Sequence, residues 1–127
     1  GAADFRRIVG RHRARWIEDQ LNLRHFNQAE LILGWLAEDG VTPGEIHFYR
    51  GELYRRRGEE GDAARARDAY EAAIRHGAAS PEAHRGLGLA HMRAGDRDAA
   101  RNAFARYLEL KPEADDREMI RSYMGDV

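Results

Sequence analysis

Two histidines are spaced so that they could share a metal ion. His84 and His91 lie seven residues apart, which places both on one face of a helix, and imidazole nitrogens are common zinc ligands. The chain has no cysteine, and no third histidine stands beside them at a suitable spacing. It also lacks His-Glu-x-x-His, Gly-x-Ser-x-Gly and any phosphate-binding glycine loop. We therefore favour a packing role for both histidines and expect no metal site and no cofactor.

Two groups of carboxylates could act as a general acid and base. Glu59, Glu60 and Asp62 form one group, and residues 115–118 form the other. Paired carboxylates serve in catalysis when an apolar pocket raises the pKa of one of them. Here the first group lies in a loop and the second at a helix start, and we expect no apolar pocket around either that would raise a pKa. We predict that both are solvated structural clusters and that the protein is not an enzyme.

Net charge and the length of the apolar runs argue against two classes of partner, nucleic acid and the membrane interior. Lys and Arg number 21 against 22 Asp and Glu, a formal net charge of −1 that provides no field for nucleic acid. The most basic run, residues 55–57, fans around a helix by about 100° per residue and does not form one basic surface. The longest apolar runs, such as 31–33, are far shorter than the roughly 20 residues that span a bilayer. We expect no direct membrane insertion; no targeting segment is recognised, which leaves cytoplasm and periplasm both open.

Apolar residues recur with helical spacing, and no stretch alternates as a strand would. The spacing predicts an all-α chain with about seven helices, at 5–23, 26–38, 43–57, 62–76, 81–94, 97–110 and 115–124. Thr42 and Ser80 each precede a proline, as N-caps do, and Glu45 is placed to complete a capping box. Gly61-Asp62 and Gly95-Asp96 each read as a C-cap glycine followed by an N-cap aspartate, and so as hairpin turns.

The sequence repeats itself at a period of about 34 residues, which indicates a stack of helical hairpins. The series Gly88, His91, Gly95, Ala100, Phe104 echoes the earlier series Gly51, Tyr54, Gly61, Ala66, Tyr70. These residues resemble the tetratricopeptide repeat, best in 81–114, where Tyr107 departs from the usual small residue. Residues 44–80 resemble it with a three-residue insertion between Tyr54 and Gly61, 10–43 are a degenerate repeat, and 115–124 look like a capping helix. We predict one domain over 1–127, an α-solenoid.

Small residues in this pattern point to close packing between helices. Glycine inside a helix costs about 1 kcal/mol relative to alanine, so Gly51 and Gly88 must be retained for a contact, with Tyr70 and Phe104 filling the space between repeats. Gly88→Leu should therefore destabilise the fold. We expect Gly125→Leu to have little effect.

The resemblance implies a concave surface lined by the first helix of each repeat. The candidate groove residues are Arg15, Phe48, Glu52, Arg55, Arg56, Arg85, Leu89, Met92 and Arg93. Their mild positive excess and apolar members suggest a protein or peptide partner with acidic and apolar character or a free C-terminus. The family's Lys and Asn carboxylate clamp is not supported, because no first helix contains lysine. An arginine-based substitute stays open.

Three functional hypotheses follow. The first is a non-catalytic module that binds a peptide or protein segment in the groove. The second is an accessory domain of a larger bacterial enzyme, because residues 107–120 resemble repeat regions that follow the catalytic domain of some zinc metallopeptidases. The third is a homo-oligomerisation scaffold.

Overall fold

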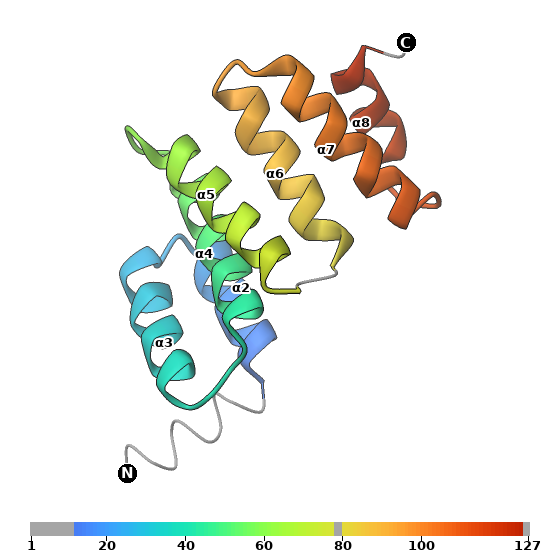
Figure 1. The fold of residues 1–127 in the computed structure, drawn as a ribbon. Coiled ribbons are helices and arrows are strands. Elements are labelled where there is room, and N and C mark those ends of the chain that lie inside the picture. Colours follow the sequence, from blue (N-terminus) through green and yellow to red (C-terminus); the bar gives the residue numbers. More distant parts are fainter. Residues whose placement is uncertain (1–11, 78–79, 126–127) are drawn as a thin grey trace.

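The computed structural model describes residues 12–77 and 80–125, and the regular elements of these residues are all α-helices. The helices are α2 (Arg13–Asn22), α3 (Phe26–Glu38), α4 (Pro43–Arg57), α5 (Asp62–Arg75), α6 (Pro81–Arg93), α7 (Arg97–Leu110) and α8 (Arg117–Met124). Antiparallel pairs α2/α3, α4/α5 and α6/α7 stack in chain order, and α8 lies on α7 at the C-terminal end (Figure 1). The predicted all-α helical repeat is confirmed.

The predicted helix bounds agree with these to within two residues, except at the start of the first helix. Of the predicted helix 5–23, residues 5–11 lie outside the described part of the chain, and the described helix begins at Arg13. Each of the three hairpins overlaps one of the repeats placed at 10–43, 44–80 and 81–114, and this division into repeats stays a prediction. The extra length of the second repeat lies in α4, which has 15 residues against 13 in α6, and in a loop one residue longer. The division of 1–127 as one domain stays a prediction.

Three of the predicted caps form. Thr42 Oγ1 accepts a hydrogen bond from the Glu45 N–H at 3.4 Å, Ser80 accepts from the Glu82 N–H, and Asp96 accepts from the Ala99 N–H. The capping box is wrong, because the Glu45 carboxylate instead accepts a hydrogen bond from Arg13.

Two predictions at helix ends are also wrong. Asp62 is not an N-cap but the first residue of α5, and it is fully buried. Gly125 caps α8 with φ at 82°, a left-handed conformation that side chains disfavour. Gly125→Leu should therefore be strained rather than neutral.

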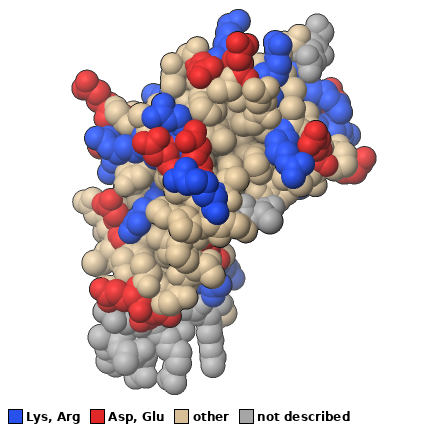
Figure 2. Space-filling view, viewed as in Figure 1, with Lys and Arg blue, Asp and Glu red and all other residues tan. Residues whose placement is uncertain are grey.

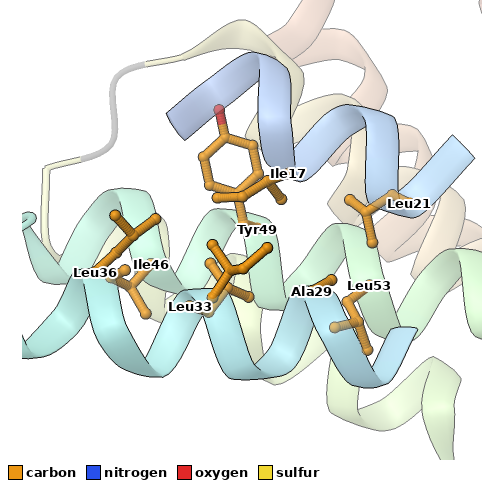
Figure 3. Close-up of a cluster of buried hydrophobic side chains, with 9 residues drawn as sticks. Ile17, Leu21, Ala29, Leu33, Leu36, Ile46, Tyr49 and Leu53 are labelled. Atoms are coloured by element: carbon orange, nitrogen blue, oxygen red, sulfur yellow. The ribbon is translucent and has the colours of Figure 1, made fainter. Parts of the chain in front are cut away.

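The largest apolar cluster lies in the first half of the chain, where α2, α3 and α4 meet (Figure 3). Its buried members are Ile17, Leu21, Ala29, Ile32, Leu33, Leu36, Ile46, Tyr49 and Leu53. They follow helical spacing on each element, so each helix contributes one apolar face. This cluster fixes α4 against the first hairpin.

Aromatic rings on the second helices pack against glycines of the first helices, as predicted. A Cβ atom at Gly51 would lie 2.8 Å from Tyr70 Cδ1, and one at Gly88 would lie 2.5 Å from Phe104 Cδ1. Gly86, which the repeat register places beside the groove, is buried under Tyr70 as well. Tyr70 therefore joins α4, α5 and α6.

Tyr107, the departure from the repeat pattern, holds the capping helix. Its ring is buried against Ala114 and Ile120, and its O–H donates to Asp116 Oδ1 at 2.7 Å. Burial and this hydrogen bond raise the pKa of Tyr107 to about 12. A large residue fits at position 107, where the repeat pattern usually has a small one, because α8 rather than another repeat covers α7.

We expect Tyr107→Phe to lower the free energy of unfolding by about 1 kcal/mol, because the half-buried Asp116 carboxylate loses a hydrogen bond. Urea denaturation followed by circular dichroism measures the change. Tyr123→Phe is the control, since Tyr123 is exposed on α8. An equal effect of the two substitutions would contradict the capping role of Tyr107.

Candidate binding groove

The first helices of the hairpins form the inner side of the array. Within residues 12–77 and 80–125, α2 contacts α4 and α4 contacts α6, whereas no contacts join α3 to α5 or α5 to α7. Helices that approach one another more closely lie on the inside of a curve. The side of α2, α4 and α6 is therefore concave, and every predicted groove residue lies on one of these three helices.

Ion pairs join the first helices of the first two hairpins, α2 and α4. Arg13 Nε lies 2.6 Å from Glu45 Oε2, which links α2 to α4. Arg56 returns from α4 to α2, where its guanidinium donates to Glu18 at 3.0 Å and to Asn22 at 2.9 Å. The guanidinium of Arg56 is thus committed to holding the helices together.

An ion pair also joins α6 to the start of the capping helix α8. Arg85 Nε lies 2.6 Å from Asp116 Oδ2, at the start of α8. Burial would raise the pKa of Asp116, but hydrogen bonds from Tyr107 and Arg85 outweigh it, and the net pKa is lowered. Arg85 is therefore neutralised by a partner within the chain.

Glu52 and Arg55, two further predicted groove residues, belong to a buried polar cluster. The Tyr70 O–H donates to Glu52 Oε2 at 2.5 Å, and Arg55 donates to the same carboxylate oxygen at 2.6 Å. Arg55 Nε also donates to the Tyr70 hydroxyl at 3.0 Å. Burial raises the pKa of Tyr70 well above its usual value, and Glu52 acts in the same direction. Glu52 is only 7% exposed, so its carboxylate is part of the repeat interface rather than a groove ligand.

Among the remaining predicted groove residues, Arg93 is an exposed cation close to apolar side chains. Arg93 ends α6 and is exposed, with its Nη2 3.7 Å from the position of a Cβ at Gly58, past the end of α4. Met92 is 37% exposed, while Leu89 and Phe48 are half-buried. In the described part of the chain, no carboxylate lies within 4 Å of the Arg93 guanidinium. Exposed Arg15, on α2, likewise has no ion pair there.

A pocket of about 380 Å³ opens where α4 and α6 begin. Its lining residues are Thr42, Gly44, Glu45, Phe48, Tyr49, His76, Gly77 and Ser80. Only Phe48 is among the predicted site residues. Glu45 lies three residues before Phe48 and Tyr49 one residue after it, but the pocket also needs the end of α5 and the start of α6, which no local pattern reveals.

The two candidate metal-ligating histidines lie on the same helix. His84 and His91 are half-buried on α6, where burial lowers the pKa of His84 and Arg106 acts in the same direction. Among residues 12–77 and 80–125, no group of three or more His, Cys, Asp or Glu is placed to hold a metal ion.

The predicted solvation of the first acidic cluster is wrong for Asp62. Its side chain is fully buried, and hydrogen bonds from Arg57, Glu59 N–H and Arg65 hold its pKa well below the usual range, although burial opposes them. A low pKa makes this carboxylate unsuitable as a proton donor or acceptor near neutral pH.

Acidic and basic side chains are mixed on the face drawn in Figure 2, without an extended area of one sign. This distribution agrees with the net charge and with ion pairing across the surface. None of the described helices is both long and apolar enough to cross a bilayer.

The fold and the concave inner side define an all-α helical repeat protein. Residues 59–115, from the loop before α5 to the end of the third hairpin, match the sequence model of the tetratricopeptide repeat family. The UPF0162 protein of Xylella fastidiosa (strain 9a5c) is 43% identical over 47 residues, which are 37% of this chain and 17% of that protein. The family match and the fold support a tetratricopeptide repeat domain. Neither comparison links the chain to a zinc metallopeptidase.

Proposed function

We propose that the chain is a non-catalytic interaction module whose concave side binds an extended segment of a partner protein. Tetratricopeptide repeats in general mediate protein–protein interaction. The observation that carries the proposal is the exposed Arg93 guanidinium, which has no carboxylate partner among the described residues and lies beside the exposed Met92 side chain on the inner helix α6. A segment with acidic and apolar residues, or with a free C-terminal carboxylate, matches both groups.

Groove arginines that already pair with a carboxylate of the chain are less available to a ligand. Arg56 and Arg85 are held by carboxylates of neighbouring helices, and Arg55 is held by Glu52. These arginines shape the groove. Among the described groove residues, Arg15 and Arg93 are the arginines without an ion pair, and Arg93 is the one that lies next to Met92. Arg55→Glu would place a second carboxylate beside the buried Glu52, so it would lower stability as well as binding and is unsuitable as a test.

We expect Arg93→Glu to weaken peptide binding by tenfold or more, about 1.4 kcal/mol. Phage-displayed random dodecapeptides selected on the parent protein supply the probes, and fluorescence anisotropy of labelled selected peptides measures their affinity. Raising the salt concentration should weaken binding to the parent in the same direction.

Arg75→Glu is the matched control. Arg75 is exposed and ends α5, the second helix of its hairpin, so the two reversals share the charge change and the unfavourable carboxylate at a helix C-terminus. We expect Arg75→Glu to change the affinity by less than twofold. Equal weakening by both variants, or by neither, would place the binding surface elsewhere.

An accessory role within a larger protein is the second candidate. It is favoured by the relative from Xylella fastidiosa, in which the matched segment is 17% of the protein. Reading the encoding gene on both sides of residues 1–127 tests it. A continuous reading frame that enters a domain with a catalytic motif supports this role, and stop or start codons directly at both ends contradict it.

A further inference from the structure

The pocket at the start of α4 has an aromatic floor and shares Phe48 with the predicted groove. Glu45, Phe48 and Tyr49 lie at i, i+3 and i+4, on the α4 face that continues toward Glu52 and the end of the helix. The Phe48 and Tyr49 rings meet edge to face with centroids 5.2 Å apart. A third aromatic ring can extend such an arrangement.

The polar groups around this floor are mostly occupied by partners within the chain. Glu45 Oε2 accepts from Arg13, Thr42 Oγ1 accepts from the Glu45 N–H, and Ser80 Oγ donates to Glu82. Because the Glu45 carboxylate faces the Arg13 guanidinium, the pocket carries little net charge. It therefore discriminates against a charged side chain, whose desolvation would not be compensated.

One lining residue of the pocket, Tyr49, carries a hydroxyl with no hydrogen-bond partner among the described residues. The Tyr49 hydroxyl points away from the aliphatic side chains of the core (Figure 3), and within the described residues it makes no hydrogen bond. Burial raises the pKa of Tyr49 to about 12, with Glu45 acting in the same direction, so the hydroxyl keeps its proton at physiological pH. It can donate to, or accept from, a group on the ligand.

We propose that this pocket receives one uncharged aromatic side chain from the segment that the groove binds. The inference rests on the proposed function for the identity of the ligand, but the pocket can be tested without the partner. Its volume of about 380 Å³ accommodates a single ring and its attached backbone, within the general range of roughly 300–1,000 Å³ for ligand pockets.

The position of Arg93 sets the spacing of the ligand's residues. Tyr49 and Gly58, which Arg93 approaches, are separated by nine helical steps of about 1.5 Å, or roughly 14 Å. An extended peptide advances about 3.3 Å per residue, so roughly four residues cover this distance. The bound segment should carry its aromatic residue about four positions from an acidic group.

Titration with side-chain analogues tests the pocket directly. The probes are p-cresol and 3-methylindole, with n-butylammonium and acetate as charged comparisons, and the readout is amide chemical shifts in ¹⁵N-labelled protein. We expect the two aromatic probes to shift the amides of residues 44–49, 76 and 77 at millimolar concentrations, and the charged probes to leave them unchanged. His76→Ala, which removes one wall, should weaken p-cresol binding at least threefold, whereas His25→Ala, an exposed histidine that does not line this pocket, should not.

Aromatic shifts that gather elsewhere, or tighter binding of a charged probe, would overturn the inference. Selected peptides from the display experiment provide an independent test. If they bind the groove but lack an aromatic residue near the expected spacing, this inference fails while the proposed function stands. If no peptide is selected, the proposed function fails, and the analogue titration still decides whether the pocket takes an aromatic ring.

Discussion

Gly86→Ala is expected to lower the free energy of unfolding by about 2 kcal/mol, although alanine is the better helix former. The added Cβ would lie 2.5 Å from both Cε1 and Oη of Tyr70, well inside van der Waals contact. Overpacking in a core costs about 1–3 kcal/mol, occasionally more, and the gain in helix propensity, up to about 1 kcal/mol, offsets only part of a clash this close.

Tyr70 has no room to move away from this clash. On its other side the ring faces Gly51, and its hydroxyl is held by Glu52 and Arg55. Displacing the ring would therefore break buried hydrogen bonds as well as packing. Gly88→Leu should be destabilising for the same reason, because the Phe104 ring occupies the space over Gly88.

Gly34→Ala is the matched control for Gly86→Ala. Gly34 lies inside α3, and a Cβ there would meet nothing within 4 Å. Alanine should therefore stabilise the helix by up to about 1 kcal/mol. Chemical denaturation of both variants gives the comparison. If Gly86→Ala were as stable as Gly34→Ala, the packing of Tyr70 between the repeats would have to be abandoned.

Local sequence patterns were sufficient for the elements of this fold. The prolines after Thr42 and Ser80, and the Gly95-Asp96 pair, mark helix ends through backbone chemistry that involves only neighbouring residues. Gly51 and Gly88 recur at the same place in two repeats, as do Tyr70 and Phe104. This recurrence predicts that each glycine packs against the aromatic ring of its own repeat.

The same patterns could not predict how charges pair. Asp62 and Gly61 have the residue types of a turn, yet the longer loop after α4 folds Asp62 under Arg57 and Arg65. The repeat register places Glu52 and Arg55 correctly on the inner face of α4, but the partner that buries them, Tyr70, comes from the next helix. Spacing assigns a face to a residue, whereas its exposure depends on which side chain arrives from another element.

Asp62→Ala is expected to lower the free energy of unfolding at pH 7 by about 3 kcal/mol. The Asp62 carboxylate is fully buried and accepts two hydrogen bonds from Arg57 at 2.9 Å, one from Arg65 at 3.0 Å and one from the Glu59 N–H at 2.9 Å. Removing one partner of a buried ion pair leaves the other charge uncompensated and costs about 3–5 kcal/mol, less here because Arg65 is largely exposed. Asp68→Ala is the control, since the Asp68 side chain is 68% exposed beside Arg67 and should contribute under about 1 kcal/mol.

The contribution of Asp62 should also depend on pH in a defined direction. Hydrogen bonds from Arg57 chiefly lower its pKa in the folded state, so the folded protein binds fewer protons than the unfolded chain. The stabilisation is therefore complete above the unfolded-state pKa of about 3.9 and is lost as the pH falls below it. Urea unfolding at steps from pH 6 to pH 2 should show a steep loss for the parent and a shallower one for Asp62→Asn, which keeps the side-chain shape. Asp116 and Glu82, whose pKa values are also lowered, supply the slope that remains in the variant. If parent and variant differed by a constant free energy across this range, the Asp62 carboxylate would not be the group whose protonation destabilises the fold.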